Sequence, residues 1–207
     1  MKKSLIIDLD GTLLNTNTFK DYIKYIFNDT LKKRKFLISV QIVVYVILRK
    51  LRIISHECMK KHILKSTSPF MSYEKLKKFT QTLYRKENLK VVELLLKYKA
   101  QNYLCILSTA APESYATIIA NHYGFDNCIA TPNYIIKNSW KENVKENKKE
   151  NTINFLKRNN ASLNIFITDH HDDLPLLKIP KEINIMVNPN IQTQQILKEN
   201  HIIFTSI

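Results

Sequence analysis

The sequence predicts an α/β fold in which a parallel sheet is flanked by helices and an all-helical cap is inserted after the first strand. Short apolar runs at 5–7, 103–108 and 164–168 have the length and composition of buried strands, and helical patterns separate them. Strands and helices that alternate in this way build parallel sheets. Residues 18–99 contain one proline, Pro69, and no glycine, so this insertion is expected to be helical almost throughout.

The chain is long enough for one domain with an inserted subdomain. Its 207 residues can bury a sizeable core. We assign residues 1–15 and 98–207 to a core that contains the sheet, and residues 16–97 to the helical cap. Within the core, a polar loop over 137–150 is expected to lead into a helix at about 149–158.

Positive charge is concentrated in the first half of the chain. The net charge is +14 at pH 7, from 32 Lys and Arg against 18 Asp and Glu. Residues 1–100 hold 22 of these cations and 8 of the anions, whereas residues 101–207 hold 10 of each. A basic surface suits phosphate-rich partners such as nucleic acid or anionic lipid. The alternative is that the charge serves solubility alone.

Glycine and cysteine usage excludes several classes of protein. The two glycines, Gly11 and Gly124, are too few for a glycine-rich phosphate loop, which excludes a P-loop or a Gly-x-Gly-x-x-Gly dinucleotide site. The three cysteines are odd in number and widely spaced, which indicates free thiols in a reducing compartment. No signal peptide precedes the first strand, so we expect a cytoplasmic protein.

Two carboxylates follow the first strand. Asp8 and Asp10 come directly after the apolar run, and Gly11 and Thr12 then turn the chain. Side chains alternate along a strand, so the two aspartates share a face at the carboxyl edge, where open α/β sheets place their sites. Carboxylate oxygens suit Mg²⁺, and the pattern therefore predicts a magnesium site. The alternative is an ordinary turn, because Asp and Gly are common turn residues.

A pair of hydroxyl side chains follows the second strand. Ser108 and Thr109 come at its end, and they are expected to open a helix that runs to about Tyr123. A hydroxyl beside a helix N-terminus can bind phosphate, because free backbone N–H groups face the ligand. The alternative is a plain helix N-cap.

A second acidic cluster follows the third apolar run. Asp169 is followed by the pair His170 and His171, and then by Asp172 and Asp173. Zinc is not expected here, because adjacent histidines are expected to point apart and no other Cys or His lies at ligand spacing.

Taken in this order, the motifs resemble those of the haloacid dehalogenase-like superfamily. The stretch Ser-Thr-Ala-Ala-Pro-Glu and the run Leu-Pro-Leu-Leu resemble its phosphoserine phosphatase-like branch. The resemblance covers residues 5–14 and about 103–190, and it implies a Rossmann-like sheet. One departure is that the branch has Gly-Asp-Ser where this chain has Thr168-Asp169-His170.

The resemblance also implies roles for the carboxylates. In that family the first aspartate, here Asp8, is the nucleophile, and the second, Asp10, is the general acid and base. The implied cofactor is Mg²⁺, held by Asp8, the backbone carbonyl of Asp10, and Asp169. Asp173 would orient a lysine or a metal-bound water, and Asp172 is the alternative for this role.

The phosphate-binding residues implied by the family are a hydroxyl, here Ser108 with Thr109 beside it, and a lysine. We predict Lys149, because Ile153 and Leu156 then lie on the buried face of the same helix, four and seven residues later. Two other lysines near the start of that helix are alternatives, Lys148 and Lys145.

The activity that follows from the resemblance is Mg²⁺-dependent hydrolysis of a phosphomonoester through an aspartyl-phosphate. The implied partner is a phosphorylated small molecule or a lipid-linked phosphate, and no nucleic acid is expected. A different class of function is a non-catalytic protein that keeps the fold and binds a polyanion or a membrane. The intact motifs argue against it, since a protein without catalytic function would tend to lose Asp8 or Asp10.

The cap contains an apolar run with basic ends. The run consists of the thirteen residues 36–48, and only Ser39 and Gln41 in its interior are polar. It is flanked by the basic stretch Lys32–Lys35 on one side and by Arg49, Lys50 and Arg52 on the other. The run is shorter than the ~20 residues that span a bilayer as a helix. It therefore predicts either a helix packed in the cap or in a dimer interface, or an interfacial helix in peripheral contact with a membrane. The oligomeric state stays open.

Overall fold

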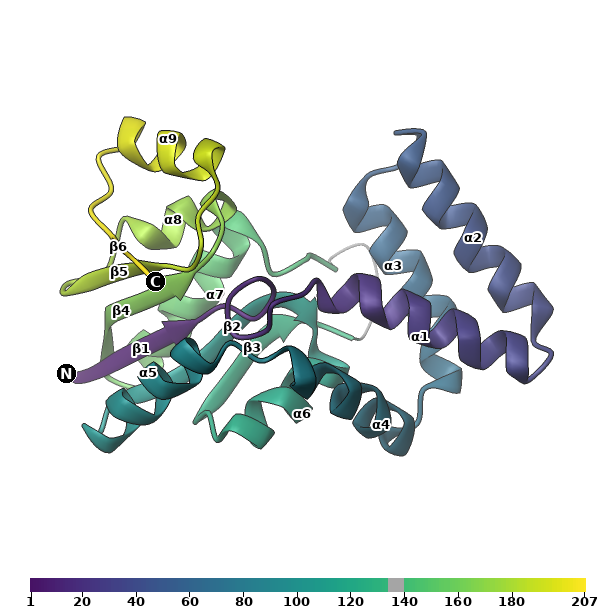
Figure 1. The fold of residues 1–207 in the computed structure, drawn as a ribbon, viewed down its shortest axis with the longest axis horizontal. Helices are drawn as coiled ribbons and strands as arrows, with labels where there is room; N and C mark the ends of the chain where they lie inside the picture. Colours follow the sequence, from purple (N-terminus) through teal and green to yellow (C-terminus); the bar gives the residue numbers. More distant parts are fainter. Residues whose placement is uncertain (134–139) are drawn as a thin grey trace.

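The computed structural model describes residues 1–133 and 140–207, and over these residues the chain forms a six-stranded sheet (Figure 1). The strand order is β3-β2-β1-β4-β5-β6, and all neighbouring pairs are parallel. This confirms the predicted α/β fold with a parallel Rossmann-like sheet. The strands are β1 (Lys2–Ile7), β2 (Leu104–Pro112), β3 (Asn127–Thr131), β4 (Ala161–Thr168), β5 (Ile183–Met186) and β6 (Thr205–Ser206).

The structure describes five α-helices between β1 and β2, and the first four of them make up the insertion. Three of these inserted helices, α1, α2 and α3, project from the end of the molecule that is remote from both termini, and α2 is outermost (Figure 1). The helices of the insertion are α1 (Thr18–Lys32), α2 (Phe36–Lys50), α3 (His56–Thr67) and α4 (Tyr73–Leu83). The others are α5 (Leu89–Ala100), α6 (Glu113–Tyr123), α7 (Lys145–Arg158), α8 (Leu174–Leu177) and α9 (Ile191–Glu199).

The sheet is covered on both faces, as the apolar strands require. Leu5 and Ile7 of β1 belong to a hydrophobic cluster that also contains residues of α5, α6 and the inserted helices. Ile6, between them, points to the opposite face and packs with residues of α7, α8 and α9. Side chains of a strand alternate between its two faces, so a strand that is buried on both has a continuous apolar run.

Polar residues at the helix starts fix where the cap helices begin. The Ser55 hydroxyl accepts a hydrogen bond from the Cys58 backbone N–H at 3.1 Å, and Ser72 caps α4 through Lys75. Asn17 caps α1 by accepting from the Lys20 backbone N–H at 2.8 Å. Each cap supplies an acceptor to a backbone N–H that has no partner within the helix. The Asn17 cap sets the start of the first helix at Thr18, shortly after the turn that follows β1.

Two boundaries differ from the sequence expectations. Strand β2 continues to Pro112, so Ser108 and Thr109 lie inside the strand and α6 begins only at Glu113. Helix α7 begins at Lys145 rather than near residue 149. The predicted polar loop over 137–150 begins among residues that lie outside the described ones.

The helix that returns the chain to the sheet packs on the core. Residues of α5 contact β2, and Val91 and Leu95 are buried in the same cluster as β1. The division at residue 97 places most of this helix in the cap, whereas its contacts are with the sheet.

Candidate active site

The turn after β1 presents the first two carboxylates. The Asp8 backbone N–H donates to the Ile167 carbonyl at 2.9 Å, which continues the β1–β4 ladder by one residue. Gly11 then adopts a φ of +74°, a conformation that glycine reaches without a steric penalty. A Cβ atom on Gly11 would overlap the Asp169 carboxylate. Glycine is therefore required here both for the turn and for the close approach of the carboxylate that follows β4.

Asp10 is held against the first turn of α1. Its Oδ1 accepts a hydrogen bond from the Thr18 backbone N–H at 2.9 Å. The N-terminus of a helix favours a negative charge, because its free N–H groups and the helix dipole point toward it. The inserted helix α1 thus contributes directly to the position of a site residue.

A buried lysine from α7 joins the carboxylates of two strands. Lys148 is 3% exposed, and its Nζ donates to Asp8 Oδ1 and to Asp173 Oδ2, each at 2.7 Å. Asp173 Oδ2 also accepts from the Thr168 hydroxyl at 2.7 Å. Charge-assisted hydrogen bonds of this length fix both partners strongly. Lys148 therefore lies where a cation would face any group bound at Asp8.

This placement contradicts the prediction of Lys149. The side chain of Lys149 is 38% exposed and pairs with Glu146 at 3.1 Å, on the outside of the helix. Lys145 lies at the rim of the site, 3.7 Å from Asp172.

The prediction was wrong because it set the phase of the helix from Ile153 and Leu156. The buried face of α7 runs through Lys148, Thr152 and Leu156, each four residues from the next. Ile153 lies beside this face and is only partly buried.

The two aspartates beyond Asp169 differ in position. Asp173 is buried and contacts Lys148, whereas Asp172 lies at the rim of the site and is mostly exposed. Asp169 accepts a hydrogen bond from the Thr12 hydroxyl at 3.3 Å. The structure thus brings Asp8, Asp169 and Asp173 together and places Asp172 at the rim of the same cavity.

The hydroxyls of Ser108 and Thr109 do not line the site cavity. Ser108 is buried, and its hydroxyl lies 2.9 Å from that of Thr152 in α7. The Thr109 hydroxyl accepts from the Ala111 backbone N–H at 3.0 Å. The expectation of a hydroxyl at a helix N-terminus fails because β2 continues for four residues beyond Ser108. The wall of the cavity nearest to them is formed by Ala110.

Sequence reasoning missed Asn143, a buried residue that lines the cavity. Its side-chain amide donates to the carbonyls of Thr109 at 2.9 Å and of Ile129 at 3.1 Å. These bonds tie the ends of β2 and β3 to the start of α7 and so help to place Lys148. An asparagine five residues before the lysine is the only signal in the sequence, and it is a weak one.

A contact between cap and core was also missed. Lys60 of α3 is buried and forms an ion pair with Glu142, and it donates to the Ala110 carbonyl at 3.2 Å. His56 of the same helix lies 3.8 Å from Glu142. The contact joins residues 82 positions apart in the chain, so no local pattern could indicate it. It holds α3 against the wall of the cavity.

The adjacent histidines do not point apart as expected. Their ring centres are 4.1 Å apart, and together with Asp172 they offer ligand atoms that lie within 4.8 Å of one another. His170 and Asp172 line the cavity at its rim.

The cavity between these residues has a volume of about 270 Å³. Its walls come from the carboxyl ends of the central strands, from the segment that precedes α7 and from the residue that caps α1. They are Asp8, Asp10, Asn17, Ala110, Asn143, Val144, Lys145, Lys148, Asp169, His170, Asp172 and Asp173.

Burial shifts the ionisation of the carboxylates in this cavity. Burial raises the pKa of Asp8 to about 8. The positive charge of Lys148 opposes this shift, and the negative charges of Asp173 and Asp169 add to it. Burial likewise raises the pKa of Asp10 and of Asp169 above the usual range. Burial alone would lower the pKa of Lys148, but Asp173 and Asp8 outweigh it and raise the pKa.

The donor set fits a divalent cation. The carboxylates of Asp8 and Asp169 lie close enough to repel one another. The buried cation of Lys148 offsets part of their negative charge. Mg²⁺ prefers such oxygen ligands, and its charge would reverse the upward pKa shifts. The Asp169 carboxylate packs closely against Gly11. It therefore lies beside the turn that also carries the Asp10 carbonyl.

Comparison with known proteins assigns the chain to one family. A family profile described as haloacid dehalogenase-like hydrolase matches residues 5–178. The chain belongs to this family, as the resemblance of its motifs predicted. No curated protein matches the chain in sequence.

Solved structures share the fold at low sequence identity. A protein of unknown function from Bordetella pertussis Tohama I is 18% identical, with a TM-score of 0.78 over 100% of this chain and 98% of that one. A structure titled as a phospho-aspartyl intermediate analogue of phosphoserine phosphatase is 19% identical, with a TM-score of 0.59 over 96% and 91%. A predicted phosphatase from Clostridium acetobutylicum is 15% identical, with a TM-score of 0.59 over 100% and 94%.

Proposed function

We propose that the protein is a Mg²⁺-dependent phosphomonoester hydrolase that works through an aspartyl-phosphate on Asp8. The observation that carries the proposal is the buried Lys148, whose Nζ lies 2.7 Å from Asp8 in a cavity lined by four further aspartates from the ends of two strands. Membership of a hydrolase family supports it. So does the likeness of the fold to a phosphoserine phosphatase whose title names a phospho-aspartyl intermediate.

In this mechanism Asp8 attacks phosphorus. A bond forms between the Asp8 carboxylate oxygen and phosphorus while the bond to the ester oxygen breaks, which divides one difficult hydrolysis into two easier steps. Lys148 donates to the same carboxylate and faces the oxygens of the transferring group, where a fixed cation offsets the developing charge. Asp173 holds the lysine in this orientation.

Asp10 is the proposed proton carrier. It gives a proton to the leaving oxygen in the first step and takes one from the attacking water in the second. Burial raises the pKa of its carboxyl, and this shift favours the protonated form that the first step needs. The Thr18 N–H fixes the carboxyl at the mouth of the cap.

The proposed cofactor site consists of Asp8, the backbone carbonyl of Asp10, and Asp169. Bound Mg²⁺ would supply charge screening, so that a phosphate dianion can approach a carboxylate. Asp169 is aimed by its contacts with Gly11 and the Thr12 hydroxyl.

We further propose that residues 1–15 and 98–207 carry the chemistry, while the insertion over 16–97 covers the approach to it. The substrate class is a phosphomonoester of a small molecule or of a lipid. A panel of phosphorylated metabolites and lipids would distinguish these two sources.

The proposal is tested by hydrolysis of p-nitrophenyl phosphate with and without Mg²⁺. Asp8→Asn should abolish turnover, because an amide is not a nucleophile, and its thermal unfolding should show that the fold is kept. Asp172→Asn is the matched control, since this rim carboxylate contacts neither Lys148 nor the turn after β1, and it should keep most of the activity. Substantial turnover by Asp8→Asn would show that Asp8 is not the nucleophile. Wild-type protein without turnover on any substrate would favour a binding protein that keeps the fold.

A further inference from the structure

Helix α2 has two apolar faces, and the inserted helices cover one of them. Ser39 and Ile42 are buried, and Ile38, Tyr45 and Val46 pack against the same hydrophobic cluster. Contacts with α1 and α3 account for this face. The opposite face carries large apolar residues that point to solvent, of which Leu37 is 83% exposed.

The exposed apolar residues are concentrated on and beside α2. Among the described residues, fifteen large apolar side chains are exposed, and nine of them fall within residues 31–53. Spacings of three and four residues place those of α2 on one side of the helix. We call these nine the α2 patch: Leu31, Phe36, Leu37, Val40, Val43, Val44, Ile47, Leu51 and Ile53. Exposed apolar surface that is concentrated in this way usually marks an interaction site.

Cations flank the patch on both sides and no anion lies between them. Residues 30–56 contain seven Lys and Arg and no Asp or Glu. Arg34 and Arg52, in the turns before and after α2, have φ values of 54° and 60°. Glycine or asparagine would reach this conformation at a lower conformational cost. Both positions nevertheless carry arginine, which places a cation at each end of the helix.

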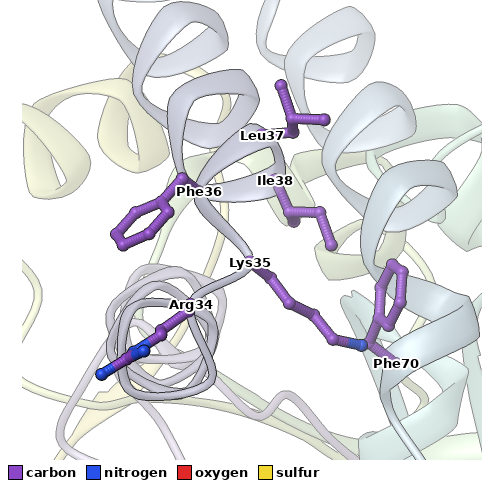
Figure 2. A pocket seen from close by; sticks show the side chains of 6 residues that line it. All are labelled: Arg34, Lys35, Phe36, Leu37, Ile38 and Phe70. Carbon is purple, nitrogen blue, oxygen red and sulfur yellow. The ribbon is translucent and has the colours of Figure 1, made fainter.

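A pocket beside the start of α2 combines the same two properties. Its volume is about 470 Å³, and it is lined by Arg34, Lys35, Phe36, Leu37, Ile38 and Phe70. Figure 2 shows Lys35 reaching toward the ring of Phe70, with its Nζ 3.7 Å from the ring centre, while Phe36 and Leu37 project in other directions. The walls are apolar, and the cations lie at the edge.

We propose that the α2 patch docks on an anionic lipid surface, with α2 parallel to the membrane plane. Apolar side chains along a helix of roughly 22 Å would enter the boundary between headgroups and acyl chains. The flanking cations would then lie at the level of the lipid phosphates, where each one favours binding. Among the described helices none is long and apolar enough to cross a bilayer, so the contact is peripheral.

The charge distribution favours lipid over a second copy of the chain. A dimer through this patch would bring two sets of seven cations together, and like charges at a contact oppose association. An anionic lipid surface supplies the opposite charge on every side of the patch. The inference goes beyond the proposed catalysis and does not rest on it, because docking needs no residue of the active site.

Vesicle co-sedimentation of the full chain tests the inference. The protein should pellet with phosphatidylglycerol vesicles at low salt and should be released at high salt, and it should stay in the supernatant with phosphatidylcholine vesicles. Leu37→Asp combined with Ile47→Asp should lower the partition constant more than tenfold, since each change removes a large apolar contact and adds a like charge. The matched control is Ile191→Asp with Ile203→Asp. These two exposed apolar residues belong to the part of the chain that contains the sheet, so this variant should bind as the wild type does.

A second pair of variants tests the cations without strain on the fold. Arg34→Gly with Arg52→Gly suits the backbone conformation and should weaken binding roughly 25-fold at low salt, about fivefold for each cation. Lys97→Gln with Lys198→Gln removes two exposed cations that lie outside helices α1 to α4, and it should have no effect on binding.

Three outcomes would overturn the inference. One is protein that stays in the supernatant with anionic vesicles at low salt. Another is binding that Leu37→Asp with Ile47→Asp leaves unchanged. A third, measured by light scattering, is a dimer that the same two substitutions dissociate, which would assign the patch to a second copy.

Discussion

Replacing Lys148, the lysine that joins the ends of two strands, is the most informative change to the site. Lys148→Met keeps much of the side-chain volume while removing a cation whose Nζ lies 2.7 Å from both Asp8 and Asp173. If Lys148 offsets charge on the transferring phosphoryl group, kcat/KM should fall by about 10²–10³, equivalent to about 2.7–4 kcal/mol of transition-state stabilisation. Initial rates with p-nitrophenyl phosphate at saturating Mg²⁺ measure this loss.

Matched variants on the same helix make the experiment specific. Lys149→Met and Lys145→Met remove cations that lie on the outside of α7 or at the rim, and each should stay within about twofold of the wild type. Thermal unfolding of all three variants checks that α7 remains folded. The reasoning is refuted if Lys148→Met keeps a third of the wild-type kcat/KM, or if Lys149→Met loses as much.

Two further predictions concern the metal and the cap. Mg²⁺ at about 100 times its Kd should stabilise the wild type by about 2.7 kcal/mol, which corresponds to a rise in Tm of about 5–10 °C by calorimetry. The variants Asp169→Asn and Gly11→Ala should lose most of this rise. Without Mg²⁺, Asp169→Asn should be at least as stable as the wild type, since it removes one crowded carboxylate; a lower Tm would contradict this. Glu142→Gln should destabilise the fold by about 3–5 kcal/mol, because it leaves the buried Lys60 without its counter-charge. Burial alone would raise the pKa of Glu142, but His56 and Lys60 outweigh it and lower the pKa, so this stabilisation is present above pH 4.5 and is lost as pH falls. Urea unfolding measured at pH 7 and at steps below pH 4.5 should therefore show a growing loss for the wild type below pH 4.5 and a smaller one for Glu142→Gln, and parallel curves would contradict the assignment.

The fold class followed from the sequence because local patterns determine it. Apolar runs such as Leu5–Ile7 are buried on both faces only in a covered parallel sheet, and the structure confirms this arrangement. The cap helices were likewise predictable, since Ser55 and Ser72 supply N-caps at their starts. These features depend on neighbours within a few residues in the chain.

The details of the site were less predictable, because they depend on packing between distant segments. The choice between Lys148 and Lys149 is a difference of one residue in helical phase, and Thr152 rather than Ile153 centres the buried face. The position of Ser108 depends on how far β2 continues along β3, which no pattern in 108–113 determines. The Lys60–Glu142 contact joins the cap to the core, and sequence alone gave no reason to pair these residues.

The apolar run in the cap shows the same limit. Its composition indicated either a packed helix or an interfacial one, and the structure shows that one face of α2 packs while the other is exposed. The thirteen residues 36–48 are apolar except for Ser39 and Gln41, so they have no polar face from which the sequence could identify the solvent side.

Trapping the covalent intermediate tests the central claim most directly. Acid quenching during turnover of radiolabelled p-nitrophenyl phosphate, followed by trypsin digestion, should place the label on the peptide from Ser4 to Lys20, which contains Asp8 and Asp10. We predict a label that hydroxylamine removes, as expected for an acyl phosphate, and that is absent from Asp8→Asn but present in Asp172→Asn. Turnover without any label, or a stable label on another peptide, would contradict an aspartyl-phosphate mechanism at Asp8.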